Sequence, residues 1–450
     1  MTQTSNGRGP GLFRPTRRSF LKGSAAAGLG LAATSTFPMP ALAQSKPDKI
    51  VVTGLQISWR RTFEEEIGPL FEQQHGIKVE FEWLPMDALA ARLKTQATSS
   101  DGGIDIAWIN TGNANTMSDM MTDFGALENE HGLPDDFDIA DILPAARSGY
   151  HINGRQIGMP FRYTTYLMHY QPEVLAQAGI TAAPGTFAEY RNAGLAVTEK
   201  FGPDRYGIGV YGRESEAMVR GWHCFLLSAG GNYYNPETWE ILVNKPEAVA
   251  SLQFYGDLVA KDKVVPPESA TWEWDGLTSG AQADRFAMTV TIGPYGTAMN
   301  DPAVSKTSGK WAWSPVPGYT DKAQSKAPNG GWAMAIPEGS PNKRWAYEFI
   351  VMSTTKAAMK STTKDGNAPP RFSVLNDPDV VARYGWAPAF SEQAKTAVDF
   401  PVPSDPIFTT VDQQIRPHMS RVLLGQSTAQ EAMDAAAAEW QRTMTRAGLI

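Results

Sequence analysis

Residues that support covalent and metal chemistry are scarce in this sequence. Its one cysteine, Cys224, excludes a disulfide within the chain, and the apolar run around it predicts a buried, inert thiol. The six histidines are scattered, with no HExxH pair, and no P-loop, GxSxG or strand-turn-helix GxGxxG motif follows residue 43. We therefore expect no catalytic residue, no metal site and no cofactor, and keep a cofactor enzyme only as a minor alternative.

Long apolar runs are also lacking. No run after residue 43 reaches the length of a membrane span. A content of 42% apolar and 19% charged residues is typical of a soluble globular protein. A chain of 450 residues is too long for one ordinary hydrophobic core, so we expect two lobes.

We interpret residues 1–43 as an export signal. Thr16-Arg17-Arg18-Ser19-Phe20-Leu21-Lys22 precedes a mildly apolar run rich in Ala and Gly, and Ala41-Leu42-Ala43 offers a cleavage site. Paired arginines followed by Phe-Leu-Lys indicate the twin-arginine pathway. We expect the mature protein in a bacterial periplasm, without a lipid anchor because no cysteine stands directly after the cleavage site.

Positive charge is deficient in the rest of the chain. Of 40 Lys and Arg and 47 Asp and Glu, five basic and no acidic residues precede residue 44, which leaves 35 against 47 and a net charge of −12. This balance argues against nucleic acid or an anionic membrane surface as a partner.

Strands and helices alternate in the predicted structure. Residues 50–54 and 104–109 are apolar runs typical of buried strands, and residues 77–83 alternate apolar and polar side chains. Helices are expected near 62–75, opened by a Thr62–Glu65 capping box, and near 87–97. This order predicts a mainly parallel sheet covered by helices. A final helix after Ser427 or Thr428 is expected to bury Met433, Ala436, Ala437, Trp440 and Met444.

Residues 149–179 are predicted to join two folding units. Asn153-Gly154 best suits the two-residue type I′ turn of a hairpin. Gly158-Met159-Pro160 is expected to end the strand ladder, because proline lacks an N–H group, before a new strand at 163–170. We interpret this break as a hinge beside a ligand cleft, with further Pro/Gly breaks at 313–319 and 366–371.

A series of short segments, taken in chain order, carries a resemblance to one known family. The segments are Gln56 to Thr62, Asp105-Ile106-Ala107-Trp108, His151 to Gln171, Ser228-Ala229-Gly230-Gly231, Ala287-Met288, Gly293-Pro294, Pro315-Val316-Pro317-Gly318, Gly330-Gly331-Trp332, Ala346 with Phe349-Ile350, and Leu424 to Thr428. In these segments the chain is similar to the extracellular solute-binding proteins of carbohydrate ABC importers, the maltose-binding-protein-like family. They cover nearly all of the mature chain, and Gln171, in a turn, departs from the usual Asn.

The resemblance implies an α/β fold of two lobes with three crossovers and a central ligand cleft. The expected lobes are residues 48–159 with 325–372 and residues 160–315 with 376–450. The expected hinges lie near 159–163, 314–324 and 372–376. It further implies a monomer that captures a small solute by lobe closure and delivers it to a membrane permease and its ATPase, with no enzymatic activity.

A polyhydroxylated ligand needs aromatic faces and paired hydrogen-bond donors and acceptors, placed on loops after strand ends. Tyr295 also stands where maltose-binding protein places a sugar-stacking aromatic. Packing within a lobe stays an alternative for Trp59 and Trp222, loop capping for Asn110 and Thr111, and an interlobe ion pair for Arg371. The candidate ligand-binding residues are Gln56, Trp59, Arg60, Asn110, Thr111, Arg162, Tyr163, Trp222, Trp272, Trp274, Tyr295, Gly331, Trp332 and Arg371.

The expected ligand is a mono- or disaccharide or a polyol. Arg60, Arg162 and Arg371 leave an alternative open, because a guanidinium fork also suits a carboxylate, sulfonate or phosphate on a sugar derivative. A non-sugar solute such as an oligopeptide or a polyamine is a further alternative. A polyamine would need several carboxylates, and the candidate loops offer only Glu273 and Asp275.

Overall fold

The structure is a computed structural model that describes residues 46–96, 103–235, 237–398 and 406–450. The export signal expected at 1–43 lies outside the described residues. Lys46–Ile450 is one compact unit. No helix in the described ranges is long and apolar enough to cross a membrane.

One sheet of eight strands runs through this unit, in the order β2-β1-β3-β10-β6-β8-β7, with β9 paired to β6. β1 is parallel to β2 and β3, as predicted, whereas β10 is antiparallel to β3 and β6. β7 and β8 are again parallel. The strands are β1 (Lys49–Leu55), β2 (Lys78–Leu84), β3 (Ile106–Asn110), β6 (Met159–Tyr170), β7 (Tyr206–Gly209), β8 (Phe286–Ile292), β9 (Ala312–Ser314) and β10 (Asn329–Ala335).

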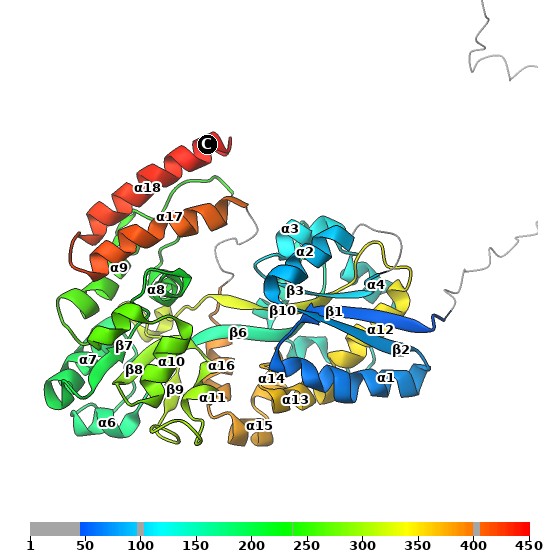
Figure 1. The fold of residues 1–450 in the computed structure, drawn as a ribbon, viewed down its shortest axis with the longest axis horizontal. Coiled ribbons are helices and arrows are strands. Elements are labelled where there is room, and N and C mark those ends of the chain that lie inside the picture. The colour runs from blue at the N-terminus through cyan, green and yellow to red at the C-terminus, as the bar shows by residue number, and fades with distance from the viewer. Residues whose placement is uncertain (1–45, 97–102, 236, 399–405) are drawn as a thin grey trace, which may run out of the picture. The chain divides into compact units, whose positions relative to one another are not determined.

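Strand β6 joins the two halves of the sheet, as Figure 1 shows. Its residues 159–165 pair with β10, and its residues 166–170 pair with β8. The hydrophobic core divides at the same point: Leu167 belongs to one cluster, and its neighbours Tyr166 and Met168 belong to a second. We call the parts built on these clusters the first and the second lobe.

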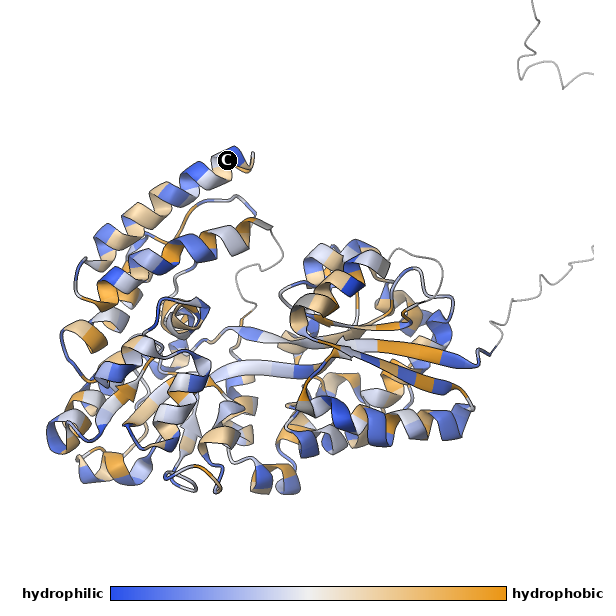
Figure 2. Cartoon of the chain, viewed as in Figure 1, coloured by the Kyte–Doolittle hydropathy of each residue, from blue (hydrophilic) through white to orange (hydrophobic). Residues whose placement is uncertain are grey.

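Helices surround both lobes, and Figure 2 shows polar residues on the outer side of α1. The first lobe has α1 (Gly68–His75), α2 (Met86–Gln96), α3 (Ala114–Met117), α4 (Phe124–His131), α5 (Pro144–Ser148), α12 (Lys343–Ser353), α13 (Lys356–Thr362), α14 (Phe372–Leu375), α15 (Pro378–Arg383) and α16 (Ala387–Ala394). The second has α6 (Pro172–Gln177), α7 (Phe187–Phe201), α8 (Glu216–Ser228), α9 (Pro246–Ala260), α10 (Trp274–Gln282), α11 (Tyr295–Met299), α17 (Pro406–Leu423) and α18 (Ala429–Arg446).

Local turn and cap chemistry was predicted well in two places. β4 (His151–Ile152) and β5 (Arg155–Gln156) form the expected hairpin, and φ is 51° at Asn153 and 76° at Gly154, as a type I′ turn requires. Thr428 and Glu431 form a capping box at the start of α18, whose predicted buried face is confirmed.

Two local predictions were wrong. Pro160 does not end a ladder, because it lies inside β6 opposite Ala333, next to a bulge that leaves Phe161 without an opposite residue in β10. Thr62 does not form a capping box with Glu65. Its backbone N–H and hydroxyl both donate to Asp365, and the chain continues through a π-helical turn (Phe63–Ile67) into α1.

Close approach of β10 to β6 depends on Gly331. A Cβ atom there would lie 2.4 Å from the carbonyl oxygen of Arg162, closer than any real contact. We expect Gly331→Ala to lower the free energy of unfolding by about 1–3 kcal/mol, the usual cost of overpacking, in urea denaturation. Gly185→Ala is the control, because its nearest atom would be the Cβ of Lys322 at 3.3 Å. Equal denaturation midpoints for the two variants would contradict this role.

Candidate functional site

The centre of the candidate site is one face of strand β6. Arg162 and Thr164 are partly exposed, whereas the alternate residues Tyr163 and Thr165 are buried. Because side chains alternate along a strand, Arg162, Thr164 and Tyr166 share one face, which we call the open face, although Tyr166 itself is largely buried. Residues 162–166 span the point where β6 passes from the first lobe to the second. These three side chains therefore form a floor that both lobes flank.

Strand β10 extends this floor. Gly330 lies opposite Thr164, and Trp332 lies opposite Arg162. A Cβ atom on Gly330 would come within 3.0 Å of the Thr164 hydroxyl and 3.7 Å of the Thr111 hydroxyl. Glycine at this position leaves space above the two hydroxyl groups, which can each donate and accept a hydrogen bond.

Arg162 is held over an aromatic ring. Its guanidinium lies 4.9 Å from the ring centroid of Trp59, and its Nη1 donates to the Gly366 carbonyl at 3.3 Å and to Asn367 Oδ1 at 3.2 Å. Trp59 in turn stacks on Trp108, with centroids 5.1 Å apart. Burial lowers the pKa of Arg162 to about 10, and nearby Tyr295 acts in the opposite direction. The group stays protonated at neutral pH.

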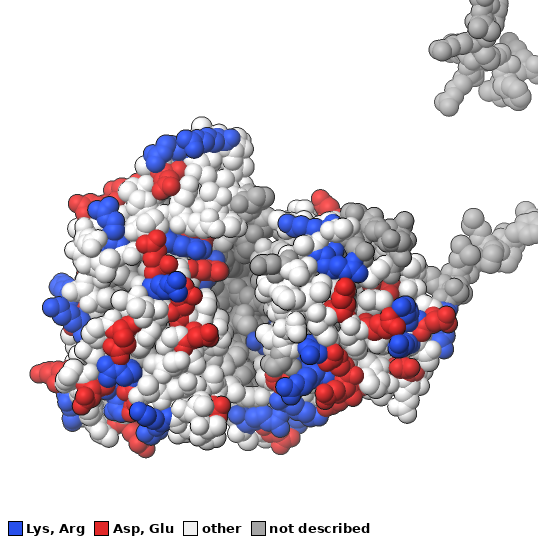
Figure 3. All heavy atoms as spheres, viewed as in Figure 1, with Lys and Arg blue, Asp and Glu red and all other residues white. Residues whose placement is uncertain are grey.

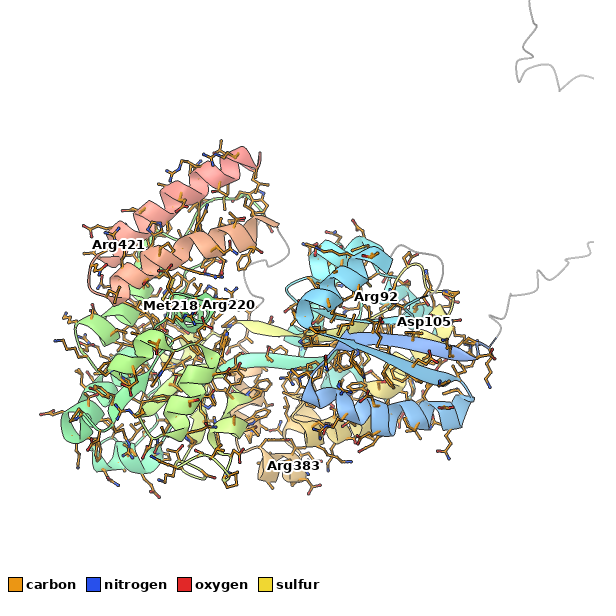
Figure 4. The ribbon with its side chains drawn as sticks, viewed as in Figure 1. Arg92, Asp105, Met218, Arg220, Arg383 and Arg421 are labelled. Carbon is orange, nitrogen blue, oxygen red and sulfur yellow. The ribbon has the colours of Figure 1, made fainter. Side chains whose placement is uncertain are left out.

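A cavity of about 240 Å³ lies over Thr164 and Tyr166. On its far side, Arg220 pairs with Glu216 at 2.9 Å and with Asp412 at 2.6 Å. Burial alone would lower the pKa of Arg220, but Asp412 and Glu216 raise it above its ordinary value. Figure 4 labels Arg220 on α8, on the side towards the first lobe. The cavity is lined by Thr111, Gly112, Thr164, Tyr166, Glu216, Arg220, Ile292, Pro328, Asn329 and Gly330.

A larger cavity of about 770 Å³ lies beside Tyr295. The Tyr295 ring meets the Trp274 ring edge-on, with ring centroids 6.2 Å apart. The centroids of Trp274 and Tyr211 are 4.8 Å apart. Burial and Asp275 raise the pKa of Tyr295, and Arg162 lowers it, so these groups lie within electrostatic reach. Figure 3 shows the surface hollowed between the lobes. The lining residues are Arg61, Pro294–Ala298, Asn300–Pro302, Trp313, Lys364–Gly366 and Arg383–Trp386.

Seven of the predicted residues line or adjoin these cavities. Thr111 lines the smaller cavity and Tyr295 the larger, and Trp274 contacts Tyr295. Arg162 and Trp332 lie together on the floor, with Trp59 beneath Arg162. Gly331 adjoins the floor, and its contribution is the close approach of two backbones.

Three others lie near the site without a demonstrated contact to it. Gln56 is exposed after β1. Arg60 pairs with Glu64 and lies 5.8 Å from the Trp83 ring. Asn110 exchanges hydrogen bonds with Asn113, because each side-chain oxygen accepts from the other residue's backbone N–H, so its carbonyl group serves the loop.

Four predicted residues are placed elsewhere, which corrects the sequence interpretation. Trp222 is fully buried in the second core, where its Nε1 donates to Ser251. Trp272 packs over Gly276 and Gly280 beneath α10. Tyr163 lies on the buried face of β6 against Phe390. Arg371 is fully buried within the first lobe, where it donates to three backbone carbonyls and pairs with Asp141 at 3.2 Å.

The sequence interpretation missed Thr164, Tyr166, Glu216, Arg220 and Asn329, all of which line the smaller cavity. Two signals were present. Thr164 and Tyr166 follow Arg162 at the period of two that a strand imposes, and Glu216 and Arg220 are four positions apart at the start of a helix. Among the described residues, no group of three or more His, Cys, Asp and Glu side chains could hold a metal ion.

Solved structures share this architecture. The sugar-binding protein MalE from Xanthomonas citri superposes with a TM-score of 0.76 at 19% identity, covering 88% of this chain and 98% of that one. A solute-binding protein from Agrobacterium vitis with bound D-mannitol gives 0.68 at 22% identity, covering 89% and 99%. The predicted two-lobe α/β fold is thereby confirmed.

Sequence comparisons agree with the fold. The mannitol-binding protein of Pseudomonas aeruginosa is 26% identical over 449 aligned positions, which cover 92% of this chain and 97% of that protein. The family model described as bacterial extracellular solute-binding protein matches residues 55–360. With that match over more than half of its length, the chain belongs to the bacterial extracellular solute-binding protein family.

Proposed function

We propose that this protein captures a sugar or polyol as the solute-binding component of an ABC importer. The observation that carries the proposal is the floor of Arg162, Thr164 and Tyr166, which lies between the lobes beside two cavities. Hydroxyl, guanidinium and carboxylate groups there suit a polyhydroxylated ligand, and the Tyr295 and Trp274 rings offer apolar faces. The similarity to mannitol- and sugar-binding proteins supports this ligand class.

Lobe closure is the proposed mechanism. A ligand that contacts both lobes binds the closed form more tightly and shifts the population towards it. Bending of β6 near 159–163 and of the segment 314–324 would provide two hinges. For the third, buried residues from Val374 to Ala394 pack in the first core, and the second core resumes at Phe408. We therefore propose that the third crossing follows Ala394, instead of lying near 372–376.

The cellular setting is also part of the proposal. The Arg17-Arg18 segment would direct export through the twin-arginine pathway into the periplasm. There the monomeric closed form would dock on a membrane permease with its ATPase, without catalysing a reaction itself. A non-sugar solute stays the second candidate ligand, and the binding screen below includes it.

Ligand binding can be tested by thermal unfolding and calorimetry of residues 44–450. We expect an alditol such as D-mannitol or ribitol, or a mono- or disaccharide, to raise the melting temperature. At a concentration of 100 Kd, a ligand specific to the folded state stabilises it by about 2.7 kcal/mol. If no sugar, polyol or sugar derivative stabilised the protein while an amino acid, peptide or polyamine did, the proposed ligand class would be wrong.

Tyr295 offers a test of where the ligand binds. We expect Tyr295→Ala to weaken the best ligand about tenfold or more, because it removes an aromatic face worth roughly 1.4 kcal/mol, while the protein stays folded. Isothermal titration calorimetry gives the change, and circular dichroism checks the fold. Tyr206→Ala is the matched control, since Tyr206 is also partly buried in the second lobe but lines neither cavity. Equal affinities in both variants would remove Tyr295 from the site.

A further inference from the structure

Arg162 differs from the other shielded arginines of the described chain. Eleven described arginines are buried or partly buried, and ten of them lie within 4.0 Å of a carboxylate oxygen. Arg162 is the exception. The paired ones are Arg60, Arg92, Arg147, Arg155, Arg191, Arg205, Arg220, Arg285, Arg371 and Arg416.

The hydrogen bonds of Arg162 leave one edge of its guanidinium open. Both bonds use Nη1, which donates to Gly366 and Asn367. The Nε and Nη2 groups form the other edge, a pair of parallel N–H donors that matches a carboxylate. Arg191 shows what that edge binds elsewhere in the molecule, since its Nε and Nη2 each donate to Asp262 at 2.6 Å.

In the part of the chain that the structure describes, no carboxylate lies within 4.0 Å of the Arg162 guanidinium. Asp365 accepts from the backbone N–H and the hydroxyl of Thr62. Glu216 is engaged by Arg220. Asp275 acts electrostatically on Tyr295 and is exposed to water, which screens it.

Basic side chains outnumber acidic ones around the larger cavity. Arg61, Lys364 and Arg383 line it together with Asp301 and Asp365. Lys364 pairs with Glu66, whereas no carboxylate of the described residues lies within 4.0 Å of Arg61 or Arg383. Figure 4 labels Arg383 below β6, where Figure 3 shows basic side chains beside the hollow. An excess of exposed positive charge at the mouth of a cleft attracts anionic ligands.

We propose that the ligand carries an acid group that binds the Nε and Nη2 edge of Arg162, so that the transported solute is a sugar acid. This inference rests on the proposed function and narrows its ligand class to aldonates and uronates. The carboxylate lies over Trp59 and beside Tyr295, and the hydroxyl groups of the ligand reach Thr164 and the Glu216–Arg220 pair.

Matched pairs of probes that differ only in the acid group test this inference. The pairs are D-mannonate and D-mannitol, D-ribonate and ribitol, and D-galacturonate and D-galactose, titrated by calorimetry into residues 44–450. In any pair that binds, we expect the acid to bind about tenfold tighter or more, as charge-assisted hydrogen bonds allow. Its affinity should also fall as salt concentration rises.

Arg162 variants assign the preference to this side chain. We expect Arg162→Gln to weaken the acid about tenfold more than its neutral partner, which removes the preference for the acid. Arg162→Lys keeps the charge without the fork and should lose only part of the preference. Arg421→Gln, an exposed arginine on α17 outside both cavities, should keep it. Melting temperatures establish that each variant is folded.

The possible failures are distinct. Tighter binding of the neutral member of a pair, or equal loss of both members in Arg162→Gln, would overturn the sugar-acid inference and leave the sugar-or-polyol function standing. Absence of binding by every member of every pair, with stabilisation by a non-sugar solute, would overturn both.

Discussion

The hydrogen-bond ladder of β6 is the constraint on which the rest of the structure depends. Residues 159–165 of this strand pair with β10 and residues 166–170 pair with β8, so the sheet of one lobe continues into the sheet of the other. Separating the strands would leave buried N–H and C=O groups without partners, which is costly. The lobes are therefore tied through the main chain, and the proposed closure would deform β6 without separating it from its neighbours.

The aromatic cluster of the first lobe gives the charge on this strand a fixed position. The Trp59 ring contacts both the guanidinium of Arg162 and the ring of Trp108. The ring centroids of Phe161 and Trp332 lie 5.7 and 6.1 Å from that of Trp59. Rings packed this closely have few alternative rotamers, so the guanidinium is preorganised before a ligand arrives. Holding the guanidinium in this position removes water from a cation, which is unfavourable and lowers the pKa of Arg162. A ligand oxygen that replaces the lost water recovers part of that cost.

Local chemistry explains what the sequence could predict. Asn153-Gly154 specifies its turn through backbone conformation alone, and a strand followed by a polar loop places Trp59 and Thr111 near the cleft. The prediction that Trp222 contacts the ligand was wrong because α8 is apolar on nearly every face. Its sequence pattern therefore does not show which side of the helix is exposed. The prediction that Arg371 contacts the ligand was wrong because its hydrogen-bond partners, the carbonyls of Phe137 and Asp138, are more than 200 positions away in the chain. Thr164 follows Arg162 at the period of a strand, but only the folded structure shows that this face of β6 is partly exposed.

Binding and closure draw on different residues of the site. Arg162, Trp59 and Thr111 belong to the first lobe or to the strand shared by both, so contacts with them are available before the lobes move. Tyr295, Glu216 and Arg220 belong to helices of the second lobe. Only contacts that improve on closure can shift the population, because a ligand with equal affinity for two states shifts nothing. On the proposed mechanism, a solute long enough to reach from Arg162 to the second lobe would promote closure. A fragment that contacts Arg162 alone would bind without closing the protein.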